Sequence, residues 1–349
     1  MKKSKFFILE AGVNHEGDLK AAIEIVKAAA KTGADAIKFQ TYTAERIAAI
    51  DSPSYWDTKE EPTSNQRDLF KKFDKLSVDD YFKLHQICVA SGIEFMTTCF
   101  DEEWVDLLDP ILQRYKVASA DITNFPLLRK VASKNKPILL STGAASISEV
   151  LDAISCINSK TNHQITLMHC VLNYPTLQEN ASLSRIKILE QNFPGFQIGY
   201  SDHTKVLTSE DAIYASYILG ARVIEKHFTL TPEKPGNDHY HSLDPESATK
   251  LISRLDSIEK MMDFNEKEFL ESQADARRYA RRGLYASRDI VAGETFTLND
   301  LIALRPTFLN GFNPNQVSEE GKFTAKLSIG IDSAITKENA IYSQVGDLP

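Results

Sequence analysis

Eight short apolar runs alternate with segments of helical period along most of this chain. Each run ends in a polar turn, and the segment after it carries apolar residues spaced three and four apart, which is typical of successive βα units and a parallel sheet. Eight such units predict an α/β fold that closes into a (β/α)8 TIM barrel. The runs cover residues 6–11, 36–40, 94–99, 114–119, 137–141, 165–171, 197–201 and 222–227.

Local signals support the alternation of strands and helices. Asp18 predicts the N-cap of a helix that Gly33 closes, and Ser146 with Glu149 predicts a capping box. A proline in the first turn predicts a further helix over residues 245–262. An open, Rossmann-like sheet is the alternative fold, but no Gly-x-Gly-x-x-Gly pattern follows the first run.

The length of the chain, 349 residues, predicts a second unit, because a barrel uses about 250 residues. A charged stretch follows the last barrel helix, and from residue 283 the pattern changes to short runs and turns. We therefore predict a barrel domain over residues 1–264, a linker or linking helix over 265–282, and a small, mainly β domain over 283–349. The connection over residues 43–77 is long, which is typical of a lid or a substrate wall.

Charge, hydropathy and cysteine usage narrow the class of protein. The formal net charge of −8 argues against a nucleic-acid-binding surface, and no apolar stretch approaches the roughly 20 residues of a membrane span. The cysteines lack CxxC spacing and lie in apolar patterns, so we expect free, buried thiols and a cytoplasmic protein. They are Cys88, Cys99, Cys156 and Cys170.

Polar side chains stand at the ends of nearly all the predicted strands, where the catalytic groups of a barrel enzyme lie. Lys38 and Lys116 belong to the second and fourth strands, and several hydroxyl side chains accompany them. A single strand-end lysine often only reaches solvent. Two lysines and several hydroxyls at one barrel mouth predict a site for a small, highly charged anion, most simply a phosphate.

Two histidines, His203 and His227, follow the neighbouring seventh and eighth strands, so their imidazoles can share one metal ion. The remaining ligand positions would fall to water, substrate oxygens or a carboxylate such as Glu10. Such an incomplete shell suits Mn²⁺ or Mg²⁺ better than a closed structural zinc site. His169 is a further candidate, but its apolar strand favours a structural role.

Six segments of the chain together resemble the sialic acid synthase family, which condenses phosphoenolpyruvate with an N-acetylated hexose. The stretch around Leu304-Arg305-Pro306 resembles the antifreeze-like (SAF) domain that ends these enzymes. The resemblance runs nearly end to end. Its motifs are EAGVNHEG at residues 10–17, KFQT at 38–41, YKVAS at 115–119, LSTG at 140–143, GYSDHT at 199–204 and IEKHF at 224–228.

The resemblance implies roles for individual residues. His203 and His227 would bind the metal, Mn²⁺ first and Mg²⁺ or Co²⁺ as alternatives. We predict that these two histidines and Glu10 form the catalytic set. Phosphoenolpyruvate would be surrounded by Lys38, Thr98, Lys116, Ser119, Ser141 and Ser201. The acceptor sugar would be held by Glu10, Gln40, Tyr174, Asp238 and, in the long connection, Asn65. Family members are domain-swapped homodimers, so Arg305 would reach the N-acyl group of the sugar in the partner's site.

Some positions depart from the family pattern. Cys99 follows Thr98 where many members have proline, and Leu172 stands where a polar phosphate contact is common. The two metal histidines are a few residues further apart, which the loop or helix between the strands absorbs. The connection with Tyr55 and Trp56 is unlike that of the commonest members. The acceptor therefore stays open between N-acetylmannosamine and a 2,4-diacetamido-6-deoxy analogue.

The predicted function is a metal-dependent transferase that makes a nonulosonic acid and phosphate with C–O cleavage, for a capsule or surface polysaccharide. The metal would polarise the aldehyde of the open-chain sugar, and Glu10 would orient water or a sugar hydroxyl. One alternative is a Schiff-base aldolase that uses Lys38, Lys116 or Lys226. A sugar receptor without catalysis is the other, and the many polar strand ends argue against it.

Overall fold

The computed structural model describes residues 5–56, 58–59, 61–159, 164–236, 238–262 and 270–344. The chain forms two compact units, Met1–Met262 and Asp263–Pro349, and each is described by itself.

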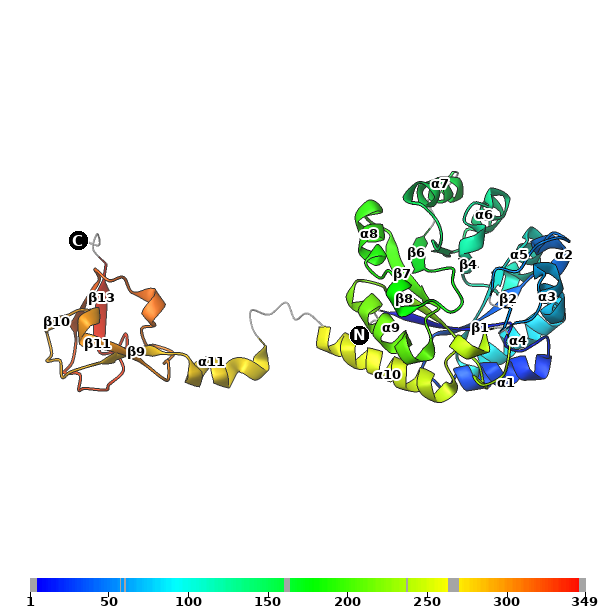
Figure 1. The fold of residues 1–349 in the computed structure, drawn as a ribbon. Coiled ribbons are helices and arrows are strands. Elements are labelled where there is room, and N and C mark those ends of the chain that lie inside the picture. Colours follow the sequence, from blue (N-terminus) through cyan, green and yellow to red (C-terminus); the bar gives the residue numbers. More distant parts are fainter. Residues whose placement is uncertain are drawn as a thin grey trace. The chain divides into compact units, whose positions relative to one another are not determined.

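The first unit is a closed barrel of eight parallel strands in sequence order, with helices around the outside (Figure 1). The predicted TIM barrel is thus confirmed. The last strand pairs with the first, so the sheet has no free edge. The strands are β1 (Phe6–Gly12), β2 (Ala36–Thr41), β3 (Glu94–Cys99), β4 (Tyr115–Val117), β5 (Ile138–Ser141), β6 (Ile165–Cys170), β7 (Gln197–Asp202) and β8 (Val223–His227).

The fourth strand is shorter than the sequence predicts. The sequence predicts a strand over residues 114–119, but β4 ends at Val117 and a 3-10 turn, η2, covers Ser119–Asp121. The turn takes Ser119 out of the strand direction and into the loop at the carboxyl end of the barrel. The Ser119 hydroxyl thereby reaches the wall of a cavity at the carboxyl ends of the strands.

The barrel helices follow the predicted capping signals. Asp18 caps the first helix, the Ser146–Glu149 capping box is formed, and the last helix starts at Pro245. The first helix ends at Ala29, before Gly33, which adopts φ +89° in the next loop. The helices are α1 (Leu19–Ala29), α2 (Ala44–Ile47), α3 (Gln66–Phe73), α4 (Val78–Ser91), α5 (Glu102–Leu108), α6 (Phe125–Ala132), α7 (Ile147–Ile157), α8 (Arg185–Asn192), α9 (Val206–Ile218) and α10 (Pro245–Met262).

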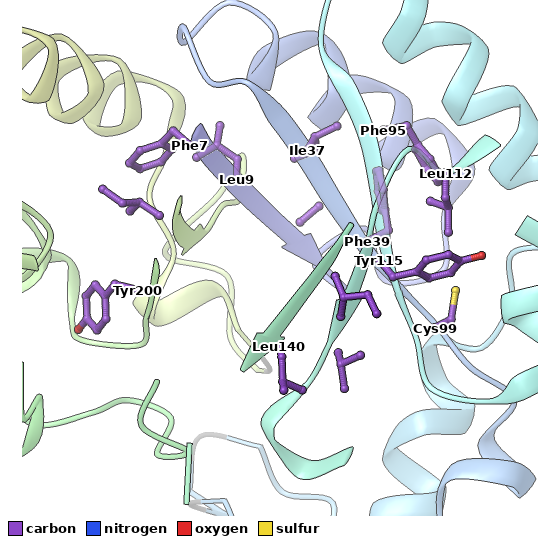
Figure 2. Close-up of a cluster of buried hydrophobic side chains, with 14 of the residues drawn as sticks. Phe7, Leu9, Ile37, Phe39, Phe95, Cys99, Leu112, Tyr115, Leu140 and Tyr200 are labelled. Atoms are coloured by element: carbon purple, nitrogen blue, oxygen red, sulfur yellow. The ribbon is translucent and has the colours of Figure 1, made fainter. Parts of the chain in front are cut away.

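Two apolar layers hold the barrel together. The larger lies between the strands and the surrounding helices and includes Phe7, Phe39 and Tyr115, which Figure 2 shows among strands β1 to β4. The smaller fills the inside of the barrel, as the fold requires, because the barrel is a packed core rather than a pore. Its residues are Ile8, Ala36, Met96, Leu139, Met168 and Val223.

The alternation of side chains along each strand places a polar layer directly beyond this interior layer. Residues i and i+2 of a strand face the same side. Two positions after each interior apolar residue stands a residue that lines the cavity described below. These residues are Glu10, Lys38, Thr98, Ser141, Cys170 and Glu225.

The second unit has its own core, in which Phe296 and Phe323 stack with ring centroids 5.2 Å apart. It contains helix α11 (Ala274–Ala280), a two-stranded sheet and a three-stranded antiparallel sheet. The predicted linker, 265–282, includes α11, and its first five residues lie outside the described residues. The strands are β9 (Gly283–Ala286), β10 (Thr295–Phe296), β11 (Leu301–Leu304), β12 (Lys322–Ala325) and β13 (Ala340–Ser343).

Two further expectations concern the cysteines and membranes. All four cysteines are free, and three are buried as predicted, whereas Cys156 is only half-buried. Among the described residues, no helix combines the length and the apolar character needed to cross a membrane.

Candidate active site

A cavity of about 560 Å³ opens at the carboxyl ends of the barrel strands. It is lined by all the predicted site residues except Asn65 and Arg305. Most of the predicted set therefore comes together in one place, which is also where this fold carries its active sites.

Two lysines and two glutamates form a connected, buried cluster in the cavity wall. Lys38 Nζ lies 2.5 Å from Glu10 Oε2 and 3.8 Å from Glu225 Oε2, and Lys116 Nζ lies 3.5 Å from Glu225 Oε1. Gln40 Nε2 donates a hydrogen bond of 3.0 Å to Glu10 Oε1. The two carboxylates offset the two ammonium groups, which allows all four charges to be buried.

The environment drives the pKa values of the two glutamates apart. Burial raises the pKa of Glu10 to about 7, against the attraction of Lys38. Burial also opposes the charge of Glu225, but Lys116 and Lys38 outweigh it and lower the pKa of that carboxyl. For Lys38, Glu10 and Glu225 outweigh burial and raise the pKa. At neutral pH, Glu10 is therefore the carboxyl of the pair that can exchange a proton.

Hydroxyl groups extend the cluster. The Thr98 hydroxyl accepts a hydrogen bond from Lys38 Nζ (3.1 Å), and the Ser201 hydroxyl donates one to Glu225 Oε1 (2.9 Å). The Ser141 hydroxyl is buried and has no hydrogen-bond partner among the described residues. Since buried polar groups in folded proteins are nearly always bonded, Ser141 marks a position for a ligand oxygen.

The backbone of Gly143 lies close to Ser119 and holds its hydroxyl beside the other hydroxyl groups. The Ser119 hydroxyl accepts a hydrogen bond of 2.9 Å from the Gly143 N–H. A Cβ at position 143 would lie 2.8 Å from Ser119 Oγ and 3.1 Å from the Cys170 carbonyl oxygen. Glycine is therefore required at this position to keep the Ser119 hydroxyl in the cavity wall.

The two predicted metal histidines are neighbours. Their ring centroids lie 5.3 Å apart, and the strand register places Glu10 opposite His227. His203 packs on Tyr174 with ring centroids 4.3 Å apart, and its Nδ1 lies 2.8 Å from the Val171 carbonyl oxygen. That contact leaves Nε2 as the nitrogen of His203 that can bind a ligand.

Two further groups lie close to His227. Donor atoms of His227, Asp238 and His241 all lie within 4.8 Å of one another. Burial, His241 and His203 hold the pKa of His227 well below its ordinary value, so its ring is neutral at pH 7. Neutral imidazoles with unbonded nitrogens, together with a carboxylate, fit a divalent metal ion.

An apolar wall faces these polar groups. Helix α3, in the long connection, contributes Leu69, Phe70 and Phe73 to the cavity, and Trp56 also lines it. The Trp56 Nε1–H donates hydrogen bonds to the carbonyl oxygens of Glu61 and Thr63, both 3.1 Å, and this orients the indole. The connection is thus a cavity wall, as the sequence predicts.

Asn65 and Arg305 are the two predicted site residues outside the cavity lining. Asn65 is the N-cap of α3: its side chain accepts from the Asp68 N–H and donates to the Ile50 carbonyl oxygen (2.8 Å). Its amide is therefore engaged in holding the helix start, and the next residue, Gln66, lines the cavity instead. Arg305 is exposed in the second unit, directly after β11.

Two other sequence candidates lie elsewhere. Lys226 does not line the cavity, and its Nζ lies 2.8 Å from Asp202 Oδ2 on the opposite face of the strands. His169 also lies outside the lining, and its Nε2 lies 2.8 Å from the Ala181 carbonyl oxygen, in keeping with the structural role favoured for it.

The structure also brings Glu225 and His241 to the site, two residues outside the set predicted from the sequence. Glu225 can be predicted from the alternation of side chains along the strand, because it lies on the same face as His227, whereas Lys226 lies on the other. His241 cannot be predicted in this way, because it belongs to a 3-10 turn, η4 (His239–His241), after the last strand.

Comparisons with known proteins agree with this fold and site. The sequence is 37% identical to N,N'-diacetyllegionaminic acid synthase of Legionella pneumophila, over 93% of this chain and 92% of the relative. It is 36% identical to the Campylobacter jejuni enzyme of the same name, over 93% and 97%. The structure of N-acetylneuraminic acid synthetase from Leptospira borgpetersenii superposes with a TM-score of 0.67, at 32% identity over 78% of this chain and 90% of that one.

A sequence model of the NeuB family matches residues 25–267. That range contains most of the barrel strands and all the predicted site residues except Glu10 and Arg305. The chain therefore belongs to the NeuB family of enzymes.

Proposed function

We propose that this enzyme condenses phosphoenolpyruvate with an open-chain N-acetylated hexosamine to give a nonulosonic acid and phosphate. The observation that carries the proposal is the buried group of Lys38, Lys116 and the unpartnered Ser141 hydroxyl, which lies in one cavity with the histidines. The names of the relatives, legionaminic and N-acetylneuraminic acid synthases, support the same class of product.

The phosphate and carboxylate of phosphoenolpyruvate would lie against the two lysines. Charge-assisted hydrogen bonds from ammonium groups to phosphate are short and strong. Thr98, Ser119, Ser141 and Ser201 add hydroxyls around them. A bound anion would compete with Glu10 and Glu225 for Lys38 and Lys116, and would leave Glu10 freer to take a proton.

The acceptor we favour is a 2,4-diacetamido-6-deoxyhexose. The wall of Leu69, Phe70 and Phe73 offers apolar contact to methyl groups, and this sugar carries a 6-methyl group and two acetyl methyls. The two relatives named as legionaminic acid synthases point the same way. N-acetylmannosamine remains the alternative. Gln40, Tyr174 and Asp238 line the cavity and are proposed to bind the polar groups of the sugar.

The reaction forms one C–C bond and breaks one C–O bond. The methylene carbon of phosphoenolpyruvate attacks the aldehyde carbon. Water adds to the former enol carbon, and Glu10 takes one of its protons and passes it to the former aldehyde oxygen, which becomes a hydroxyl. The tetrahedral carbon then expels phosphate, which takes the second proton of the water, and becomes the keto group of the product. With a pKa near 7, Glu10 is suited to accept and return this proton.

We propose that His203 and His227 hold a divalent ion, Mn²⁺ in the first place. When bound, such an ion supplies Lewis-acid polarisation of the aldehyde and an anchor for its oxygen. The unbonded Nδ1 of His227 and the neutral state of its ring support the assignment.

We also propose a domain-swapped homodimer in which the second unit is an antifreeze-like domain whose Arg305 reaches the partner's sugar. Arg305 is exposed, and its guanidinium is a strong donor for an amide carbonyl oxygen. The small β unit with its own core supports the assignment of a separate domain.

A phosphate-release assay tests the proposal. Phosphoenolpyruvate labelled with ¹⁸O in the bridging oxygen is incubated with a panel of N-acyl hexosamines and Mn²⁺. We expect phosphate that carries the label with at least one sugar, and loss of the reaction in chelator. Unlabelled phosphate would exclude C–O cleavage, and activity in chelator would exclude the metal.

A Schiff-base aldolase would give a different result: borohydride with substrate would trap a covalent lysine adduct. The raised pKa of Lys38 disfavours the neutral amine that this chemistry requires, and Lys226 does not line the cavity.

A further inference from the structure

His241 is a buried histidine without a polar partner. Its side chain is fully buried, and neither ring nitrogen has a hydrogen-bond partner among the described residues. Asp238 Oδ1 lies 3.8 Å from its Nε2, beyond hydrogen-bond distance. Buried polar atoms are almost always satisfied, so two unpaired nitrogens on one ring require an explanation.

The position of the His241 ring explains why its nitrogens have no partner. The centroids of the three imidazoles lie 4.7 Å apart for His227 and His241, 5.3 Å for His203 and His227, and 6.4 Å for His203 and His241. With a metal–nitrogen bond of about 2.1 Å, two rings on one ion can have centroids up to roughly 6.5 Å apart. All three rings therefore lie within reach of a single ion.

The donor atoms of two of these rings also lie together with a carboxylate oxygen, whereas His203 adjoins them through its ring distances. Those of His227, Asp238 and His241 lie within 4.8 Å of one another. Donors on opposite sides of one ion are roughly 4.2 Å apart at the same bond length. Small side-chain movements would bring the group to bonding distance.

We propose that His241 is a third imidazole ligand of the divalent ion, beside His203 and His227 and with the Asp238 carboxylate next to it. The inference rests on the metal dependence in the proposed function. Each added imidazole raises the affinity of a site for Co²⁺ and Zn²⁺ more than for Mn²⁺, and disfavours Mg²⁺, which prefers oxygen ligands. The shell still leaves positions for substrate oxygen.

A neighbouring histidine provides the matched control. His239 lies in the same short turn and is also buried. Its Nδ1, however, lies 2.7 Å from the Thr229 hydroxyl, and its Nε2 lies 3.6 Å from Glu16 Oε1. Nδ1 of His239 thus has a hydrogen-bond partner, unlike either nitrogen of His241, and both contacts of His239 lie outside the donor group, so its replacement should not affect the ion.

The experiment is pulsed electron paramagnetic resonance of Mn²⁺ bound to the full chain without substrates, with ¹⁵N-labelled and unlabelled histidine. Three imidazole nitrogens should couple to the ion in the wild-type protein. His241→Ala should lose one of them and weaken Mn²⁺ binding at least tenfold, because even second-shell changes cost about 10–100-fold in affinity. His239→Gln should change neither the count nor the affinity.

Two coupled nitrogens in the wild-type protein would overturn the inference, whether or not any variant folds. An unchanged count or affinity in His241→Ala, with its circular dichroism intact, would overturn it as well. Failure of the proposed function looks different: no sugar would release phosphate although the three-nitrogen spectrum is present. Conversely, metal-dependent phosphate release with a two-nitrogen spectrum would overturn the His241 assignment alone.

Discussion

Glu10 lies between the lysine cluster and the histidines of the site. On one side it forms an ion pair of 2.5 Å with Lys38, and on the other the strand register places it opposite His227. It is 1% exposed, and burial raises its pKa to about 7. A carboxyl with this pKa is ionised above pH 7 and protonated below it, so it can act as a base only on the alkaline side.

Glu10→Gln should lower kcat by roughly 10²–10⁴-fold, the usual contribution of a positioned acid or base, while the Mn²⁺ affinity changes little. In the wild-type enzyme, kcat/KM should fall about tenfold for each pH unit below about pH 7, because only ionised Glu10 can accept the proton. The variant should lack this acidic limb. Steady-state kinetics from pH 5 to 9 checks both expectations. Unchanged turnover, or an acidic limb that persists in the variant, would remove Glu10 from the mechanism.

At the scale of elements, the strand alternation decides which polar residues reach the cavity. In β8, Glu225 and His227 face inward, whereas Lys226 faces the other way and pairs with Asp202. Period-two reasoning applied to the sequence predicts this arrangement. It would have identified Glu225 and removed Lys226 from the candidate nucleophiles. The barrel and the strand-end residues could thus be predicted because regular strands fix the direction of their side chains.

The irregular segments could not be predicted in the same way. The family resemblance implies that Asn65 lies near the sugar, but Asn is also a preferred helix N-cap, and that is the role it takes in α3. His241 lies in a short turn whose path depends on tertiary packing rather than on a repeating pattern. The distance of such residues from the cavity is set by contacts far apart in the sequence.

Helix α3, in the long connection after β2, is expected to select the acceptor sugar. Phe73→Ala removes a ring from the apolar wall, so kcat/KM for the 2,4-diacetamido-6-deoxy sugar should fall about tenfold or more, the cost of lost apolar contact in a specificity pocket. N-acetylmannosamine, which has a 6-hydroxyl, should lose less. Kinetics with both sugars measures the ratio. Lys71→Ala, on the exposed face of α3, is the control. Equal losses for the two sugars would show that the wall does not select the acceptor.

At the scale of the whole molecule, each unit has a hydrophobic core of its own, so each can fold without the other. The barrel carries the lysines, the hydroxyls and the histidines, whereas Arg305 belongs to the second unit. In the proposed dimer, Arg305 would act on the partner's barrel rather than on its own. A swapped dimer and an arrangement within one chain make opposite predictions when two defects are placed on different chains.

An Arg305→Ala chain and a His227→Ala chain should each have little activity alone. If they are mixed at equal amounts and allowed to exchange subunits, half of the dimers are mixed, and each has one barrel with an intact His227 that receives an intact Arg305 from its partner. The mixture should therefore recover about a quarter of the wild-type phosphate release per chain, as statistical pairing in a symmetric dimer requires. Differently tagged chains, purified as mixed dimers, should reach about half of it. If Arg305 served its own barrel, each chain would keep one defect at its only site and no activity would return. Recovery thus depends on the swap itself, since neither the fold nor the chemistry of the single units differs between the two arrangements.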